Sequence, residues 1–338
     1  MPSSQNVDVT VAIRNGPMDQ AAEESDKQIA LLTNKAANRG RAEAKGHIVA
    51  ELLTSLGRHV DHVLPDDIQG TYRAVREAVS EDRHIVAVGG DGFIHHVVQG
   101  CAETSATLGI IPAGTGNDFA FGLDLPQDLD NAVRSAVSPS QRVDILKFEK
   151  PTGQKCYGAT IATAGFSATV NIRADAMAWP RGPSRYTLAT LIELLRLQRY
   201  ELQMVVDGVE VDGQCLMVAI ANTRAFGGGM QIAPDASPTA GHADIVVIRD
   251  TSAFNLLRML PKTFKGGHIG HPAVEVRTGR VIQLELLCTD RAKSGNLRSD
   301  GENVGSLPQT VTVVPGGLRV AGISPPLTVA GEAREHTE

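Results

Sequence analysis

The sequence is 338 residues long, enough for about two domains of ordinary size. Its formal net charge of −6 argues against a nucleic-acid binder and against a protein held to anionic membranes by overall charge. The four cysteines are far apart and indicate neither a disulfide framework nor a zinc site. There is no signal-peptide pattern and no apolar run of about 20 residues, so we expect a cytoplasmic protein, with peripheral contact at the inner membrane face left open.

The first half of the chain predicts alternating strands and helices. Residues 1–27 form an N-terminal extension with a short strand at Val7–Ile13. Beyond it, short apolar runs predict strands at 29–33, 59–63, 84–88 and 108–111. Apolar residues at helical spacing predict helices at 42–56, 68–79 and 93–101. The alternation predicts an α/β domain over residues 28–138, with a parallel sheet flanked by helices.

After residue 138 the pattern becomes rich in short strands separated by Gly, Asp or Pro turns. This predicts a C-terminal antiparallel β-sandwich domain over residues 139–320. The expected strands are 143–148, 157–163, 202–206, 216–221, 245–248, 274–277, 281–287 and 310–314. We expect turns at Asp207-Gly208 and Pro315-Gly-Gly317, and one helix at 186–199. Residues 321–338 predict a loose tail.

Two glycine loops follow predicted strands at the end where parallel sheets bind ligands. The first is Gly89-Gly-Asp-Gly92, whose backbone N–H groups suit phosphate, although a tight turn with an Asp cap would read the same way. The second is Pro112-Ala-Gly-Thr-Gly-Asn-Asp118, in which Thr115 and Asn117 are suited to phosphate or ribose oxygens. Asp91 and Asp118 are placed to organise a divalent cation, and Asp91 also suits an acceptor hydroxyl. Neither loop has the Walker or dinucleotide spacing.

Together the loops resemble the nucleotide signatures of the diacylglycerol kinase catalytic-domain superfamily, which includes bacterial lipid kinases, sphingosine kinases and ceramide kinases. Asn34-Lys-Ala-Ala-Asn-Arg-Gly40 is similar to a degenerate form of the family's first phosphate loop. Further motifs fall in family order: Arg142-Val-Asp144, Ala164-Gly-Phe166, Phe226-Gly-Gly-Gly229 and Asp300-Gly-Glu302. The resemblance implies an ATP- and Mg²⁺-dependent kinase whose lipid acceptor meets ATP between the two domains.

The resemblance also implies a role for individual residues. Those around the nucleotide would be Asn34, Gly89, Gly90, Asp91, Gly92, Gly114, Thr115, Gly116, Asn117 and Glu302. Mg²⁺ would be held by an acidic network of Asp91, Asp118 and Asp144. The general base would be Asp300, as in bacterial lipid kinases, or Asp91, as in sphingosine kinases, and the sequence leaves both open. Phosphoryl transfer itself needs positioning, charge neutralisation and a base near the hydroxyl.

Several positions depart from the family pattern. Phe93 replaces a threonine of the phosphate site. His95 and His96 replace an Asn/Glu pair, and we interpret them as ordinary histidines on the helix surface. Ala240 replaces the first carboxylate of a secondary metal site. The loop Gly165-Phe-Ser-Ala-Thr169 lacks the acidic residue with which sphingosine kinases meet a lipid amine, so we expect a neutral acceptor such as diacylglycerol.

Other interpretations stay open at this point. The fold could belong to a catalytically silent nucleotide- or lipid-binding protein, to a sphingoid-base kinase, or to a NAD kinase, which shares the first loop. The expected partner is a lipid presented at a membrane surface, and a homodimer is left open. The segments 179–186 and 258–268 combine apolar and basic residues as an interfacial segment would, although a solvated loop and a packed helix end fit equally well.

Overall fold

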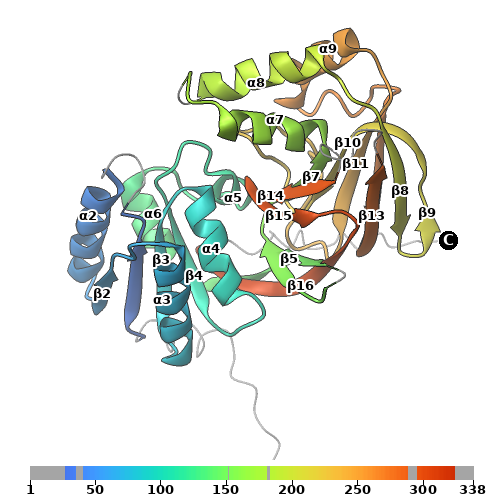
Figure 1. Cartoon of the computed structure of the whole chain (residues 1–338). Helices are drawn as coiled ribbons and strands as arrows, with labels where there is room; N and C mark the ends of the chain where they lie inside the picture. Colours follow the sequence, from blue (N-terminus) through green and yellow to red (C-terminus); the bar gives the residue numbers. More distant parts are fainter. Residues whose placement is uncertain (1–26, 36–40, 151, 181–182, 288–294, 324–338) are drawn as a thin grey trace, which may run out of the picture.

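A computed structural model describes residues 27–35, 41–150, 152–180, 183–287 and 295–323. The expected strand at Val7–Ile13, most of the expected first phosphate loop and the tail beyond residue 323 lie outside these residues. Figure 1 shows two parts side by side, a helix-flanked parallel sheet and a strand-rich part that carries helices at its far end.

The first half contains a parallel sheet with strand order β2-β1-β3-β4. Its strands are β1 (Ile29–Thr33), β2 (Val60–Val63), β3 (His84–Gly89) and β4 (Thr107–Pro112). Every residue of β1, β3 and β4 is buried. Strands buried on both faces have continuous apolar sequences, and for that reason β1, β3 and β4 could be predicted from the sequence.

Helices cover both faces of this sheet. They are α2 (Arg41–Ser55), α3 (Ile68–Ser80), α4 (Asp91–Cys101), α5 (Asp118–Gly122) and α6 (Leu129–Ala136). Val75 of α3 and Val97 of α4 share one core, whereas Leu53 of α2 and Val133 of α6 share the core on the opposite face. The expected helices correspond to α2, α3 and α4. The sequence analysis missed α6, because 8 residues are too few to show a clear apolar period.

The second half is built from antiparallel strands, as expected. They are β5 (Ser140–Glu149), β6 (Lys155–Gly158), β7 (Ile161–Gly165), β8 (Tyr200–Val206), β9 (Val209–Glu210), β10 (Gly213–Ala221), β11 (Ala243–Arg249), β12 (Val274–Gly279), β13 (Val281–Leu287), β14 (Asn296–Ser299), β15 (Glu302–Ser306) and β16 (Gln309–Ala321). Phe148, Val218 and Ile282 belong to the core between them. The single strand expected at 157–163 is two strands, because Ala159 and Thr160 leave the ladder to contact a side chain discussed below.

The described residues of the second half contain three helices where one was expected. These are α7 (Phe166–Ala176), α8 (Pro183–Leu195) and α9 (Ala253–Thr263). They cover the outer face of β10 and β11, where Val170, Met217 and Leu256 share a core. The expected helix at 186–199 corresponds to α8, and α7 was missed because it has few large apolar residues to mark one face.

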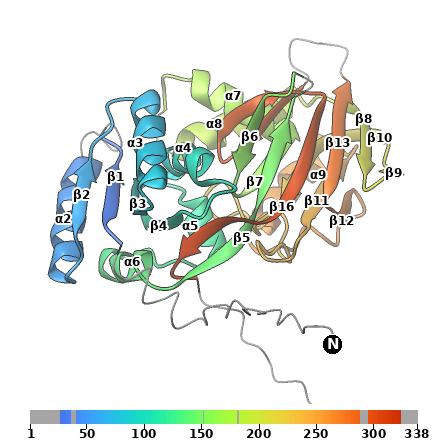
Figure 2. The same ribbon diagram turned by 90° about the horizontal axis from the view of Figure 1, so that it is seen from below.

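The last strand joins the two halves into one sheet. β16 pairs antiparallel with β5 and then parallel with β4, where Arg319 lies opposite Thr107 (Figure 2). The expected end of this strand at Pro315-Gly-Gly317 was wrong. These residues form an irregularity between Val314 and Leu318, and the strand continues to Ala321. A bulge uses the same residue types as a turn, so the local sequence could not separate the two.

Candidate active site

The two glycine loops lie in contact at the carboxyl ends of β3 and β4. A Cβ atom placed on Gly90 would lie 2.9 Å from the Cα of Gly114, so a side chain at Gly90 would collide with the second loop. The N–H of Ala113 donates to the carbonyl of Gly89 at 2.8 Å. The N–H of Gly114 donates to Asn117 Oδ1 at 2.9 Å. The loops therefore form one surface at the edge of the sheet.

Two carboxylates border this surface. Asp91 begins α4 and Asp118 begins α5. A Cβ atom on Gly116 would lie 2.9 Å from Asp91 Oδ2 and 3.5 Å from Asp118 Oδ2. Burial, followed by the charge of Asp118, raises the pKa of Asp91 to about 6. Burial also raises the pKa of Asp118, against the hydrogen bonds that it accepts. Two such carboxylates repel each other, and a cation between them would relieve the repulsion.

The second half reaches Asp118 through a run of glycines. The N–H groups of Gly227 and Gly228 donate to the two Asp118 carboxylate oxygens at 2.7 and 2.9 Å. Both glycines have positive φ, 61° and 80°, which glycine adopts without strain. Consecutive N–H groups in such a run form an anion-binding concavity. The sequence analysis placed this motif only in family order, and the structure now gives its contact.

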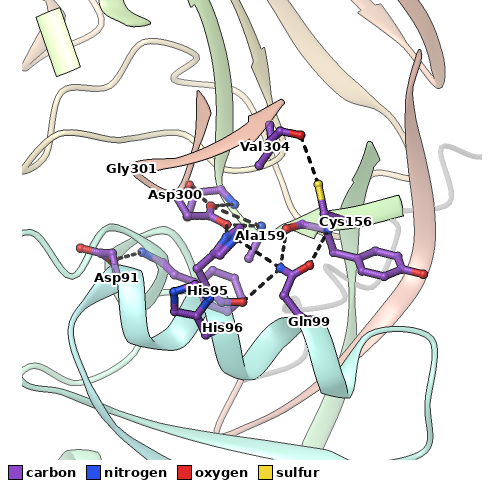
Figure 3. Close-up of polar contacts among 12 residues, drawn as sticks. Asp91, His95, His96, Gln99, Cys156, Ala159, Asp300, Gly301 and Val304 are labelled. Carbon is purple, nitrogen blue, oxygen red and sulfur yellow. Dashed lines mark hydrogen bonds and ion pairs between the residues drawn. The ribbon is translucent and has the colours of Figure 1, made fainter. Parts of the chain in front are cut away.

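Asp300 lies in a two-residue turn that joins β14 to β15. The φ angles of Asp300 and Gly301 are 55° and 83°, as in the type I′ turns of tight hairpins. The Asp300 side chain is only 4% exposed. It accepts hydrogen bonds from the N–H of Ala159, from the N–H and hydroxyl of Thr160, and from His95 Nδ1. Figure 3 shows Ala159 and His95 beside Asp300. Burial alone would raise its pKa, but the hydrogen bonds and the His95 charge outweigh burial and lower it.

Glu302 follows this turn and lies against the first glycine loop. A Cβ atom on Gly92 would be 2.9 Å from Glu302 Oε1. Arg298, on the other arm of the hairpin, donates to the carbonyl of Gly301 and to Asp175 of α7. The turn thus lies between α4 of the first half and α7 of the second.

Asp144 does not join the cluster of Asp91 and Asp118. It is buried on β5, where its oxygens accept the N–H groups of Gly241 at 2.6 Å and Gly316 at 2.8 Å. Among the described residues, no group of three or more His, Cys, Asp or Glu side chains is placed to hold a metal ion. The structure brings Asp91 and Asp118 together, and the expected role of Asp144 at Mg²⁺ stays a prediction. Asp144 joins the segment that carries Gly241 to the irregular part of β16 at Gly316.

The interpretation of His95 as a surface histidine was wrong. It is 7% exposed and its Nδ1 lies 2.9 Å from Asp300 Oδ2. His96 is half-buried, with Nδ1 3.0 Å from the hydroxyl of Tyr72 on α3. The physical reason is the position of α4, which packs against α3 on one side and against β6 on another. A helix expected to have one exposed face has none in this stretch.

The remaining expected residues lie around the loops with different surroundings. Asn34 directly follows β1, and its N–H donates to the carbonyl of Val88 at 3.2 Å. Thr115 is exposed at the tip of the second loop. Asn117 has a left-handed backbone conformation, and its side-chain oxygen is used within the loop. Phe93, which replaces the family threonine, is buried in the core against Gly89.

Lys45 is a residue of this site that the sequence analysis missed. It lies on α2, and its ammonium donates to the carbonyl of Pro112 at 2.5 Å. Burial lowers its pKa. Among the described residues no carboxylate forms an ion pair with it. The positive charge of Lys45 at the base of the second glycine loop is therefore not neutralised by such a pair. A lysine in the helix that follows the first phosphate loop was a signal that could have found it.

Each half of the chain matches a known protein family. Residues 28–148 match the diacylglycerol kinase catalytic domain, and residues 160–322 match the YegS C-terminal NAD kinase beta sandwich-like domain. A diacylglycerol kinase of Mycobacterium tuberculosis (strain ATCC 25618 / H37Rv) is 32% identical over 297 residues, which cover 87% of this chain and 94% of that protein. The chain belongs to the diacylglycerol kinase family. Within that family it is a lipid kinase.

More distant relatives match as well. A diacylglycerol kinase of Bacillus subtilis (strain 168) is 28% identical over 245 residues, covering 70% of this chain and 77% of that protein. The crystal structure of a putative diacylglycerol kinase from Bacillus anthracis str. Sterne matches with a TM-score of 0.70 at 20% identity, covering 89% of this chain and 98% of that one. In the part of the chain that the structure describes, no helix is long and apolar enough to cross a membrane.

Proposed function

We propose that this chain transfers the γ-phosphate of ATP to the hydroxyl of a neutral lipid, with diacylglycerol as the first candidate. The observation that carries the proposal is the meeting of two halves around Asp91 and Asp118. The glycine loops come from the first half, and the N–H groups of Gly227 and Gly228 come from the second. Phosphoryl transfer is catalysed by positioning and charge neutralisation, and this arrangement is built for both.

Asp91 and Asp118 fit a magnesium ion. Mg²⁺ is commonly bound by one or two carboxylates together with substrate phosphates, and it prefers hard oxygen ligands. Burial is the main cause of the raised pKa of both side chains, and the charge of Asp118 adds to it at Asp91, so a bound cation would stabilise their ionised forms. When bound, the ion would neutralise charge on the transferring phosphate. The N–H groups of the glycine loops and the ammonium of Lys45 fit phosphate oxygens.

Asp91 is the better candidate for the residue that takes the proton from the lipid hydroxyl. Its side chain accepts a long hydrogen bond from the N–H of Phe119 at 3.4 Å, and in the absence of a bound cation its pKa is raised to about 6, mainly by burial. Asp300 accepts hydrogen bonds from His95, Ala159 and Thr160, and its pKa is lowered. A carboxylate has about four lone-pair sites, so Asp300 has none left for a hydroxyl. We assign the general base to Asp91 on this ground.

An apolar pocket favours a neutral acceptor. It lies beneath α7, α8 and α9, has a volume of about 100 Å³, and is lined by residues that include Phe166, Met217 and Leu256. None of the described residues that line it is acidic, so nothing there would pair with the amine of a sphingoid base. Phe226 and Met230 also line it, and they flank the glycines that hold Asp118. An acyl chain could therefore begin close to the carboxylates.

The helix layer above this pocket suits contact with a lipid surface. Large apolar side chains are exposed there: Trp179, Leu195, Phe254 and Phe264 are 78%, 89%, 65% and 52% exposed. Basic side chains of the same layer, Arg258, Lys262 and Lys265, would meet anionic headgroups. We propose that α8 and α9, at the end of the molecule far from the parallel sheet in Figure 1, face the membrane. A cytoplasmic location and a homodimer stay predictions.

The substrate assignment is tested by supplying purified protein with ATP, Mg²⁺ and mixed micelles of diacylglycerol, monoacylglycerol or sphingosine. We expect phosphorylated diacylglycerol, and no product when EDTA removes the metal. A preference for sphingosine would contradict the neutral acceptor. Phosphorylation of NAD but of no lipid would contradict the lipid acceptor altogether.

The membrane contact is tested by flotation with vesicles that contain anionic lipid. We expect the double charge reversal Lys262→Glu/Lys265→Glu to reduce the floating fraction. The matched control is Lys150→Glu/Lys155→Glu, which reverses two charges at the β5–β6 hairpin. Equal flotation of both double variants and the wild type would contradict the proposed membrane face.

A further inference from the structure

The Asp300 carboxylate is held by groups from both halves of the molecule. Ala159 and Thr160 belong to the second half, as Asp300 does, and donate from the backbone and from the Thr160 hydroxyl. His95 belongs to α4 of the first half and donates from Nδ1 at 2.9 Å. The two side chains are 7% and 4% exposed, so water does not compete for this contact.

His95 is itself fixed by Gln99, one helical turn further along α4. Gln99 Nε2 lies 3.4 Å from His95 Nε2 and donates to the carbonyl of Tyr157 at 2.8 Å. The N–H of Tyr157 donates to Gln99 Oε1 at 2.9 Å, which fixes the orientation of the amide (Figure 3). With a proton on Nδ1, His95 donates to Asp300, while its Nε2 faces the Gln99 amide, which also donates to the carbonyl of His95 at 3.1 Å.

This series of hydrogen bonds matters because it lies beside Glu302 and the first glycine loop. Glu302, two residues after Asp300, lies against Gly92 of the first glycine loop. Asp91 precedes His95 by four residues and therefore lies on the same side of α4. A shift of the turn that carries Asp300 would move Glu302 away from the loop that we assign to the nucleotide.

We propose that His95 is a positioning residue, and that the His95–Asp300 pair is an interdomain lock that holds Glu302 at the nucleotide loop. The predicted effect of this lock on ATP binding rests on the proposed function, whereas its geometry does not. In this role Asp300 acts through the hydrogen bonds that it accepts from His95, Ala159 and Thr160.

The test compares three substitutions of His95. His95→Asn keeps a donor at the position of Nδ1, whereas His95→Gln places its amide one bond further out and His95→Ala has no donor. We expect the Ala and Gln variants to weaken binding of a fluorescent ATP analogue about tenfold, the usual size of one lost hydrogen bond to a charged group, and to raise KM for ATP more than they lower kcat. His95→Asn should stay within about threefold of the wild type. His84→Asn, at a buried histidine of β3 whose Nε2 lies 2.8 Å from the carbonyl of Ala136, is the matched control.

Hydrogen exchange supplies a readout that needs neither ATP nor lipid. The Ala and Gln variants should exchange faster in the β14–β15 hairpin and unchanged in the β8–β9 hairpin. Unchanged exchange and ATP affinity in His95→Ala, or equal behaviour of Gln and Asn, would overturn the lock. So would an Asp300→Asn variant that loses kcat with ATP affinity and exchange intact, since a base would behave in that way. If the wild type phosphorylates no lipid while these binding and exchange results hold, the proposed function fails and the lock stands.

Discussion

Two Asp-Gly turns in the second half have the same backbone and different surroundings. Asp207-Gly208 joins β8 to β9 with φ angles of 48° and 87°, and Asp300-Gly301 joins β14 to β15 with 55° and 83°. Asp207 is exposed and accepts the N–H groups of Arg280 and Val281, which belong to its own sheet. Asp300 is buried and meets His95 from the other half of the chain.

The comparison separates what the local sequence determines from what the tertiary structure adds. Asp-Gly between two strands dictates a type I′ turn in both places, because both central residues need positive φ. The role of each carboxylate depends on the part of the structure that contacts it. At Asp207 this is backbone of the same sheet, and at Asp300 it is helix α4 and the strand break at Ala159 and Thr160.

Replacing each turn aspartate should separate the two sites most clearly. We expect Asp300→Ala to lower kcat/KM by about a hundredfold, since misplacement of substrate-positioning groups by about 1 Å can cost that much. Asp207→Ala should change kcat/KM by less than about twofold, as surface substitutions do. Steady-state kinetics of both variants check this. Equal losses would mean that the surroundings of the two turns do not differ in function.

Thr160→Val should weaken the hydrogen bonding that holds Asp300. The substitution removes the 2.6 Å hydrogen bond from the Thr160 hydroxyl to Asp300 and keeps the shape of the side chain. A hydrogen bond to a charged group contributes about 1.5 to 3 kcal/mol, so we expect activity to fall about tenfold or more. The control is Thr163→Val, a buried threonine on the following strand β7. A similar loss in both variants would point to a general packing defect.

Gly301→Ala and Gly208→Ala should cost similar stability and differ in kinetics. Both glycines have positive φ, and a Cβ atom meets nothing within 4 Å at either, so only backbone strain of about 1 to 2 kcal/mol is added. Denaturant unfolding should show equal losses, whereas KM for ATP should rise only in Gly301→Ala. A change in KM of the same size in Gly208→Ala would remove the contrast between the turns.

The contributions of Asp91 and Asp300 to stability should depend on pH in opposite directions. The folded-state pKa of Asp91 is raised from 3.8 to about 6, so its stabilising contribution is present below about pH 4 and is lost as the pH rises to 6. The pKa of Asp300 is lowered, so its contribution is present at neutral pH and is lost in acid. Without Mg²⁺, we expect Asp91→Asn to raise Tm at pH 7 by a few degrees and to lose that gain near pH 4.

Asp300→Asn should lower Tm at pH 7 under the same conditions. Thermal unfolding of both variants across this range is the measurement. Differences in Tm from the wild type that do not change with pH would contradict the assigned pKa shifts.

The sequence predicted the parallel sheet well because β1, β3 and β4 are continuous apolar runs, and it predicted both glycine loops because glycines and polar residues follow β3 and β4 directly. It did not predict the burial of His95, since that depends on β6 packing on α4. It also placed Asp144 with the metal ligands, although its oxygens bind Gly241 and Gly316. Contacts between halves depend on pairings far apart in the chain, which local patterns do not encode.

The most direct test of the central claim is transfer of radiolabelled phosphate from ATP to diacylglycerol by the wild type and by Asp91→Asn, with ATP binding measured on the same preparations. We predict that the wild type forms phosphorylated lipid in the presence of Mg²⁺. Asp91→Asn should still bind ATP but lose at least about a hundredfold in kcat, the lower range for removal of a general base. A wild type that binds ATP without phosphorylating any lipid, or an Asp91→Asn variant with unchanged kcat, would contradict the account.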